Sequence, residues 1–217
     1  QPTITSNSSI SFAENNTSAV TTVTSSDLDV GDTAAYSISG EDVGDFSINA
    51  STGVLTFAST PDYENPTDSD GNNTYIVIVT VTDSGSLTDT QTLTVSVTGV
   101  NDNQPTITSN SAGSTASISF AENNTSAVIT VTSSDTDAGD TATYSISGTD
   151  VDDFTINAGS GVLTFASTPD YENPTDSNTD NTYIVIVTVT DSGSLTDTQT
   201  LTVSITGVNE VPSITSN

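Results

Sequence analysis

Hydrophobic and polar residues alternate with a period of two along most of this chain. The segments "TYIVIVTVTD" at 74–83 and "DTQTLTVSVTG" at 89–99 are the longest examples. Shorter alternating runs at 35–39, 45–49 and 53–57 are separated by Gly, Asp and Asn. This alternation, with turn residues about every 8–12 positions, predicts short β-strands that have one buried face. No segment has the periodicity of an amphipathic helix.

The pattern predicts seven strands in the first half of the chain and their equivalents in the second half. The expected strands cover residues 8–12, 18–25, 34–38, 45–49, 54–57, 74–82 and 88–98. Short strands with this spacing are typical of an all-β, antiparallel sandwich. The residues expected to point into the core are Ile10, Phe12, Val23, Tyr36, Ile38, Phe46, Ile48, Leu55, Phe57, Val77, Val79, Val81, Leu93, Val95 and Val97.

The second half of the chain repeats the first almost residue by residue. "ISFAENNTSAV" at 10–20 returns at 118–128, and the segment at 73–96 returns at 181–204, so the offset is 108 residues in both cases. Self-similarity at a fixed period is the signature of tandem structural units. The sequence therefore predicts two tandem domains of about one hundred residues each.

The domain boundary is expected where the first copy ends and the second begins. The first repeat is predicted to cover residues 1–103, with a linker at 99–105, and the second repeat residues 104–211. The last residues, 212–217, read "PSITSN" and are expected to begin a further strand or repeat.

Charge narrows the possible functions. The chain has 217 residues with 28 Asp and Glu and no Lys, Arg or His, so its formal net charge is −28. Nucleic acids and anionic membrane surfaces are bound through Lys and Arg, so neither is expected as a partner. A Ser–His triad and a zinc site of His and Cys are excluded because the chain has no His and no Cys. Protons at very low pH, high salt and divalent cations are the candidates that could offset the carboxylates.

The remaining composition favours a folded domain from outside the cell. Intracellular proteins rarely lack basic residues, and the 32% of hydrophobic residues are concentrated in alternating segments, unlike those of a disordered chain. No apolar run approaches the ~20 residues that span a bilayer. The absence of a signal peptide and of Met suggests a mature or internal piece of a longer protein.

Some acidic residues need no functional explanation, because Asp is common in turns. This interpretation covers Asp45, Asp68, Asp70, Asp89 and their equivalents in the second repeat. Four other groupings in the first repeat are explained less well by turns. They are Glu14 in "FAEN", Asp27 and Asp29 in "SSDLDVGD", Asp62 and Glu64 in "PDYEN", and Asp83 in "VTDSG".

In a sandwich whose strands run up and down, these groupings divide between the two ends. Stacking two repeats end to end would bring the lower end of the first toward the upper end of the second, with the linker between them. The carboxylates expected to converge are Glu14, Asp62, Glu64, Asp102, Asp135, Asp137 and Asp191. Because no cationic side chain can neutralise them, and Ca²⁺ prefers about six to eight oxygen ligands, this cluster predicts a calcium site.

The order of these motifs resembles that of cadherin repeats. "AEN", D-x-D, "DYE", "VTD" and "VNDNQP" follow the x-E-x, D-x-D, D-R-E, x-D-x and D-x-N-D-N-x-P motifs of that family. The resemblance covers both repeats almost end to end. It implies tandem seven-stranded Greek-key β-sandwiches, cadherin/immunoglobulin-like, with up to three Ca²⁺ ions at each junction. It further implies that Asn101 binds through its side chain and Asn103 through its backbone carbonyl, and that a carbonyl near Asp140 contributes.

The sequence departs from the family pattern at several positions. Gly99 replaces the first Asp of the linker motif, and Tyr63 and Tyr171 replace the Arg of D-R-E. The second linker, "GVNEVP", has Glu210 at the position of Asp102. Trp is absent, so the strand-swapping Trp of vertebrate classical cadherins has no counterpart, and prokaryotic surface proteins are the nearer comparison.

The outer ends of the two repeats are expected to be half-sites. A neighbouring repeat, or an identical chain placed end to end, would complete them. Their residues are Asp27, Asp29, Asp83, Glu122, Asp170, Glu172, Asn209 and Glu210.

These observations predict a non-enzymatic, calcium-stiffened structural or adhesive segment of a secreted or cell-surface adhesin or filament, without direct membrane contact. A cell-surface protein or a glycan is a further possible partner. The alternative is a carbohydrate-binding module, for which Tyr63, Tyr75, Tyr171 and Tyr183 are the candidate exposed aromatic residues. A carboxylate pair such as Asp62 and Glu64 could in principle cleave glycosides, but its register with the linker favours ion binding.

Overall fold

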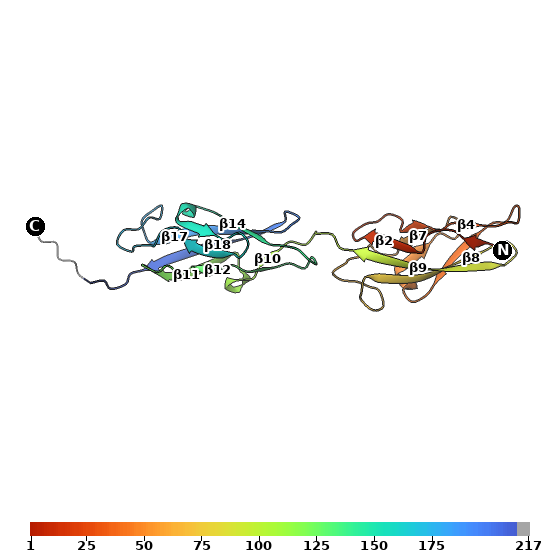
Figure 1. Ribbon diagram of the computed structural model, residues 1–217, viewed down its shortest axis with the longest axis horizontal. Helices are drawn as coiled ribbons and strands as arrows, with labels where there is room; N and C mark the ends of the chain where they lie inside the picture. The colour runs from red at the N-terminus through yellow and green to blue at the C-terminus, as the bar shows by residue number, and fades with distance from the viewer. Residues whose placement is uncertain (212–217) are drawn as a thin grey trace, which may run out of the picture. The chain divides into compact units, whose positions relative to one another are not determined.

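The computed structural model describes residues 1–211, and the chain divides into two compact units, Gln1–Val100 and Asn101–Asn217. The expected strand or repeat at 212–217 lies outside the described residues. The regular secondary structure of each unit is almost entirely β-strand, as the alternating pattern predicts (Figure 1). Among the described residues, no helix is long and apolar enough to cross a membrane.

The first unit contains nine strands and one short 3-10 helix, η1 (Val43–Asp45). The strands are β1 (Thr3–Ile4), β2 (Ser9–Ala13), β3 (Thr21–Thr22), β4 (Ser25–Ser26), β5 (Ala35–Ser39), β6 (Phe46–Ile48), β7 (Val54–Phe57), β8 (Thr74–Thr82) and β9 (Thr88–Thr98). They form a four-stranded sheet in the order β2-β9-β8-β5, a three-stranded sheet in the order β3-β7-β6 and a β1-β4 pair. All pairs are antiparallel except β2 and β9, which run parallel.

The core of the first unit lies between its sheets. The register places Tyr75, Val77, Val79 and Val81 of β8 beside inward residues of β9, and all four are fully buried. Every core residue predicted from the alternation is buried or packs against this cluster. Tyr75 also belongs to the core and was not predicted there; its ring packs edge-on against Phe57, with ring centroids 5.1 Å apart.

The second unit repeats this arrangement. Its strands are β10 (Thr106–Ile107), β11 (Thr115–Ala121), β12 (Ile129–Thr130), β13 (Ser133–Ser134), β14 (Thr143–Ser147), β15 (Phe154–Ile156), β16 (Val162–Phe165), β17 (Thr182–Thr190) and β18 (Thr196–Thr206). The sheet orders β11-β18-β17-β14, β12-β16-β15 and β10-β13 match those of the first unit. The 3-10 segments are η2 (Asn110–Ala112), in the connection between β10 and β11, and η3 (Val151–Asp153).

Two details of the strand prediction were wrong. The strand expected at 18–25 is two short strands, because β3 pairs with β7 whereas β4 turns to pair with β1. The pattern also missed β1, which is only two residues long. Asp89, assigned to a turn, lies within β9 and its carboxylate accepts a hydrogen bond from the backbone N–H of Ile4 at 2.8 Å.

Each unit also contains a buried carboxylate that the sequence did not single out. Asp42 is 4% exposed and accepts hydrogen bonds from the backbone N–H groups of Ser69 (2.8 Å) and Ile76 (2.7 Å). Asp150 does the same in the second unit, with Ser177 and Ile184. These carboxylates satisfy backbone donors where a loop meets the four-stranded sheet, so their role is structural.

Candidate metal sites

A buried glutamate marks the end of each unit at which the last long strand leaves. Glu14 follows β2, and it is 3% exposed. Its carboxylate accepts hydrogen bonds from the backbone N–H groups of Tyr63 (2.6 Å) and Val100 (2.7 Å). Because β2 runs parallel to β9, the ends of both strands reach the same edge, and the glutamate ties the strand exit to the loop before β8.

Glu122 occupies the same position in the second unit. It is 2% exposed and accepts hydrogen bonds from the backbone N–H groups of Val208 (2.5 Å) and Tyr171 (2.8 Å). These two bonds, the one from Val208 foremost, lower the pKa of Glu122 below its ordinary value. The carboxylate is therefore held in its charged form, which is the form that binds a metal ion.

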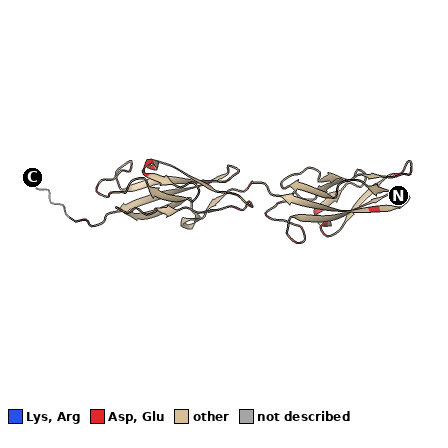
Figure 2. Cartoon of the chain, in the orientation of Figure 1, with Lys and Arg blue, Asp and Glu red and all other residues tan. Residues whose placement is uncertain are grey.

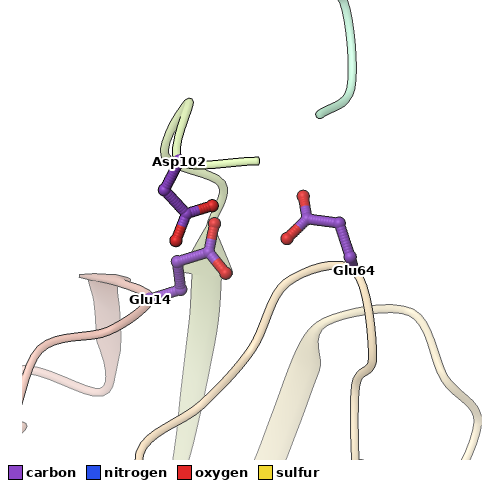
Figure 3. Close-up of side chains that lie close together, drawn as sticks. All are labelled: Glu14, Glu64 and Asp102. Carbon is purple, nitrogen blue, oxygen red and sulfur yellow. The ribbon is translucent and has the colours of Figure 1, made fainter. Parts of the chain in front are cut away.

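Further carboxylates gather around each of these glutamates. Oxygens of Glu14, Glu64 and Asp102 lie within 4.8 Å of one another, and Figure 3 shows the three side chains turned toward a common space. Glu64 comes from the loop between β7 and β8, and Asp102 from the segment that follows β9. Asp62, expected beside them, accepts hydrogen bonds from the backbone N–H groups of Glu64 and Asn65, both at 3.1 Å, and so holds the loop in shape.

The equivalent group in the second unit consists of Glu122, Asp170 and Glu172. Partial desolvation raises the pKa of Glu172 above its ordinary value. The negative charge of Glu122 adds to this shift, although less than desolvation does. Glu210, at the position of Asp102, accepts a hydrogen bond from the side chain of Asn123 at 2.8 Å.

A second kind of cluster lies at the opposite end of the second unit. Oxygens of Asp135, Asp137 and Asp191 lie within 4.8 Å of one another, and Asp137 and Asp191 are buried. The backbone N–H of Asp137 donates to Asp135 (2.9 Å), and that of Leu195 donates to Asp191 (2.7 Å). The D-x-D loop and the hairpin after β17 thus present three carboxylates to one point.

Linker asparagines complete this end of the second unit. Asn103 donates its backbone N–H to Asp137 Oδ2 (2.9 Å) and its side-chain Nδ2 to Asp137 Oδ1 (2.8 Å). Asn101 Nδ2 donates to Asp140 Oδ1 (2.8 Å) and to Ser192 Oγ (3.1 Å). The amide oxygens of the linker are thereby oriented by the same loops that carry the carboxylates.

Several oxygens in this cluster lack hydrogen-bond donors. Asp135 Oδ2, Asp191 Oδ2 and Asn101 Oδ1 are buried and accept no hydrogen bond within the described part of the chain. Unsatisfied buried oxygens, two of them on carboxylates, are costly unless a cation takes the place of the missing donors. Carboxylate and amide oxygens are the ligands that Ca²⁺ prefers, so the residues fit a calcium ion.

The corresponding end of the first unit holds Asp27, Asp32 and Asp83, whose oxygens also lie within 4.8 Å of one another. They line a recess of about 100 Å³. Asp29, the second Asp of the motif, has a side chain that is 72% exposed, and its carboxylate lies 3.7 Å from the terminal amine of Gln1.

Sequence reasoning missed the side chains of Asp32 and Asp140. Ser84 Oγ donates to Asp32, and Ser192 donates to Asp140 through its backbone N–H (2.9 Å) and its Oγ (2.5 Å). The hydrogen bonds from Ser192 lower the pKa of Asp140. The signal was present in the sequence, because "GD" follows the D-x-D motif at the same distance in both repeats.

Comparison with models of known protein families identifies the family of this chain. The model of the Cadherin domain matches residues 8–98 and again residues 116–206. The chain belongs to the cadherin family. Cadherin domains are extracellular adhesion and structural modules, calcium binding is typical of them, and they are not enzymes.

Solved cadherin structures share the fold. Drosophila N-cadherin EC1-4 has a TM-score of 0.75 at 21% identity, covering 94% of this chain and 49% of that chain. Mouse cadherin-23 EC22-24 has a TM-score of 0.69 at 24% identity, with 95% and 65% covered. Human protocadherin-24 EC1-2 has a TM-score of 0.74 at 22% identity, with 96% and 98% covered. The chain thus spans about half the length of the Drosophila cadherin chain. A search of curated protein sequences finds no match.

Proposed function

We propose that this cadherin-repeat chain is a calcium-stiffened structural segment of an extracellular adhesin or surface filament. The proposal rests on three buried oxygens near the linker, on Asp135, Asp191 and Asn101. None of them accepts a hydrogen bond from the described residues. In a chain without Lys, Arg or His, only an external cation can neutralise them. Extracellular calcium modules have dissociation constants of ~10⁻⁴–10⁻³ M, which suits this role.

The full ligand set under this proposal joins the two repeats through the linker. It comprises Glu14, Asp62, Glu64, Asn101, Asp102, Asn103, Asp135, Asp137 and Asp191, with repeats at 1–103 and 104–211. The charge that the ions neutralise would otherwise drive the repeat ends apart, so calcium would convert a hinge into a stiff joint. The outer carboxylate groups, around Asp27 and around Glu122, would be completed by a neighbouring repeat or an identical chain.

The carbohydrate-binding alternative has less support. Two of its four candidate aromatic residues, Tyr75 and Tyr183, are fully buried in the cores, so the expectation that they are exposed was wrong. Tyr63 packs against the first core, and only Tyr171 presents a substantial exposed surface, at 43%. A single exposed ring is a weak platform for a sugar.

The proposal is tested by small-angle X-ray scattering of the chain in calcium and in chelator. With calcium we expect a narrow distribution of maximum dimensions, and after chelation a broader one. Asp191→Asn should remove the response to calcium. Asp152→Asn, which removes the same charge from the exposed 3-10 helix η3, should retain the response. A scattering profile of the unmodified chain that does not change on chelation would rule the proposal out.

A further inference from the structure

The hairpin that joins β17 to β18 is one of the acidic connections of the second unit, and it also contacts the linker. Figure 2 shows the strands almost entirely tan, with acidic residues mostly in the connections. This hairpin reads "DSGSL" at 191–195, and the hairpin of the first unit at 83–87 has the same sequence. The two hairpins are therefore a matched pair, in which a difference in contacts comes from the surroundings and not from the hairpin residues themselves.

Glycine has an unexpected position in this turn. The backbone N–H of Asp191 donates to the carbonyl of Leu195 (3.0 Å), and that of Ser194 donates to the carbonyl of Asp191 (3.3 Å). The left-handed residue of the turn is Ser194, with a φ of 75°, although Gly is the usual residue at that place in a three-residue hairpin loop. Gly193 itself lies outside the left-handed region. The backbone of the turn therefore does not explain why residue 193 is Gly.

A side chain of the linker occupies the space beside Gly193. A Cβ atom added at Gly193 would lie 2.2 Å from Asn101 Oδ1, 2.8 Å from Asn101 Cγ and 3.4 Å from Asn101 Cβ. Carbon atoms in contact are normally about 3.5–4.0 Å apart, so a larger residue at 193 would displace the Asn101 amide. The three nearest atoms all belong to the Asn101 side chain, so the hairpin can accept a methyl group once that side chain leaves.

Polar groups hold the amide of Asn101 in this position. Asn101 Nδ2 donates to Asp140 Oδ1 (2.8 Å) and to Ser192 Oγ (3.1 Å), and Ser192 Oγ donates to Asp140 Oδ1 (2.5 Å). Asn101 Oδ1 is buried and accepts no hydrogen bond from the described residues. These contacts suit an amide, because an Asp at position 101 would lack the Nδ2 donor and would place a second carboxylate against Asp140.

We propose that Asp140, Ser192 and Gly193 form a socket for an asparagine side chain at linker position 101, and that Gly193 is the positioning residue that makes room for it. The first unit supports this assignment. Gly85 has the same place in the same sequence, but among the described residues a Cβ there would approach only Asp83 Oδ1, at 3.3 Å. Contact with a linker side chain is therefore what distinguishes Gly193 from Gly85.

The socket has a consequence for calcium, and this part of the inference rests on the proposed function. A linker side chain that is already held in place lowers the entropy cost of ordering the linker when an ion binds. Loss of the socket should therefore weaken calcium binding although every carboxylate remains.

Hydrogen exchange of the Asn101 side-chain amide, measured by NMR on the full chain in EGTA, tests the socket without calcium. Gly193→Ala should raise the exchange rate of these protons about tenfold, because hydrogen bonds to a charged group are lost. Gly85→Ala is the matched control and should change the rate less than about twofold, and circular dichroism checks that both variants fold. An unchanged rate in Gly193→Ala would overturn the proposal, as would an equal increase in both variants.

Calorimetric titration with CaCl₂ tests the consequence through a double-mutant cycle. Gly193→Ala should raise the dissociation constant about three- to tenfold, and no more than Asn101→Ala does. In the Asn101→Ala background, Gly193→Ala should have no further effect, because both changes remove the same contact. Additive losses would overturn the proposal, because Gly193 would then act independently of Asn101. If the unmodified chain bound no calcium, the proposed function would fail, whereas the exchange rates in EGTA would still decide whether the socket holds Asn101.

Discussion

The Asp-rich ends of the two units have nearly the same sequence but differ in structure. Asp137 of the second unit is 8% exposed, with both carboxylate oxygens bonded by Asn103. Its counterpart Asp29 in the first unit has a side chain that is 72% exposed. In the second unit, Asn103 of the linker thus holds the D-x-D motif through both oxygens of Asp137.

The opposite ends of the units provide the contrasting case. Glu14 and Glu122 are both buried, and each accepts two backbone hydrogen bonds from equivalent donors. Those donors belong to the loop before the long hairpin and to the residue two positions after the last strand. This end of the domain is thus organised by its own strands and loops, whatever follows along the chain.

The largest expected effect is the loss of calcium stabilisation in Asp137→Asn. At a calcium concentration about 100 times the dissociation constant, binding stabilises the folded state by about 2.7 kcal/mol. We expect most of this gain to disappear in Asp137→Asn and most of it to remain in Asp29→Asn, because only Asp137 is held in place by the linker. Urea unfolding in calcium and in EGTA measures both. If both variants lost the same amount of calcium stabilisation, the contact between the linker and Asp137 would not be important for calcium binding.

The next effect should be the same in both units. Asp42→Asn and Asp150→Asn each weaken two hydrogen bonds to buried backbone N–H groups, and we expect each to lower the free energy of unfolding by about 1–3 kcal/mol, with or without calcium. Asp152→Asn, at an exposed position, should stay within about 0.5 kcal/mol. If only one of the two variants lowered the free energy of unfolding, the buried carboxylates would not have the same role in the two units.

The pH dependence of the Asp150 effect has a definite sign. Desolvation raises the pKa of Asp150, but the hydrogen bonds from Ile184 and Ser177 outweigh it, and the net pKa is lowered. A lowered pKa contributes stability that is present above the ordinary Asp value of about 3.9 and is lost as the pH falls through the folded-state pKa. The difference in unfolding free energy between the unmodified chain and Asp150→Asn should therefore be constant at neutral pH and shrink in acid. A difference that grew in acid would contradict this explanation.

The alternating pattern was sufficient to predict the fold, because a period of two assigns each residue of a strand to one face. It correctly predicted which residues of β8 and β9 face the core, for example the fully buried Val77 and Leu93. It could not predict where one strand changes partner between β3 and β4, since both pieces show the same alternation. Two-residue strands such as β1 are too short to carry a periodic signal.

The candidate sites were predictable in composition but not in their hydrogen bonds. Motif order pointed to the residues that gather at each end, such as Glu14 and Glu64. It did not show that Asp62 holds its own loop, or that Asp32 groups with Asp27 and Asp83. These details depend on loop conformation, which sets the direction of short side chains and leaves no periodic trace in the sequence.

The smallest expected effect is the change in calcium affinity when a side chain of the linker is removed. Asn103→Ala removes the side-chain hydrogen bond to Asp137 Oδ1 (2.8 Å) and a longer one to Asp102 Oδ1 (3.1 Å), but it keeps every carboxylate and the backbone N–H bond to Asp137 Oδ2. One such bond to a charged group contributes about 1.5 kcal/mol, so we expect the dissociation constant for calcium to rise by about tenfold or less. Asn178→Ala, which removes an exposed amide bonded to Asp180 in the same unit, should leave it unchanged. Calorimetric titration with CaCl₂ measures both variants. Because the sandwich is untouched in Asn103→Ala, an unchanged affinity would mean that the D-x-D motif is ordered by its own loop and not by Asn103.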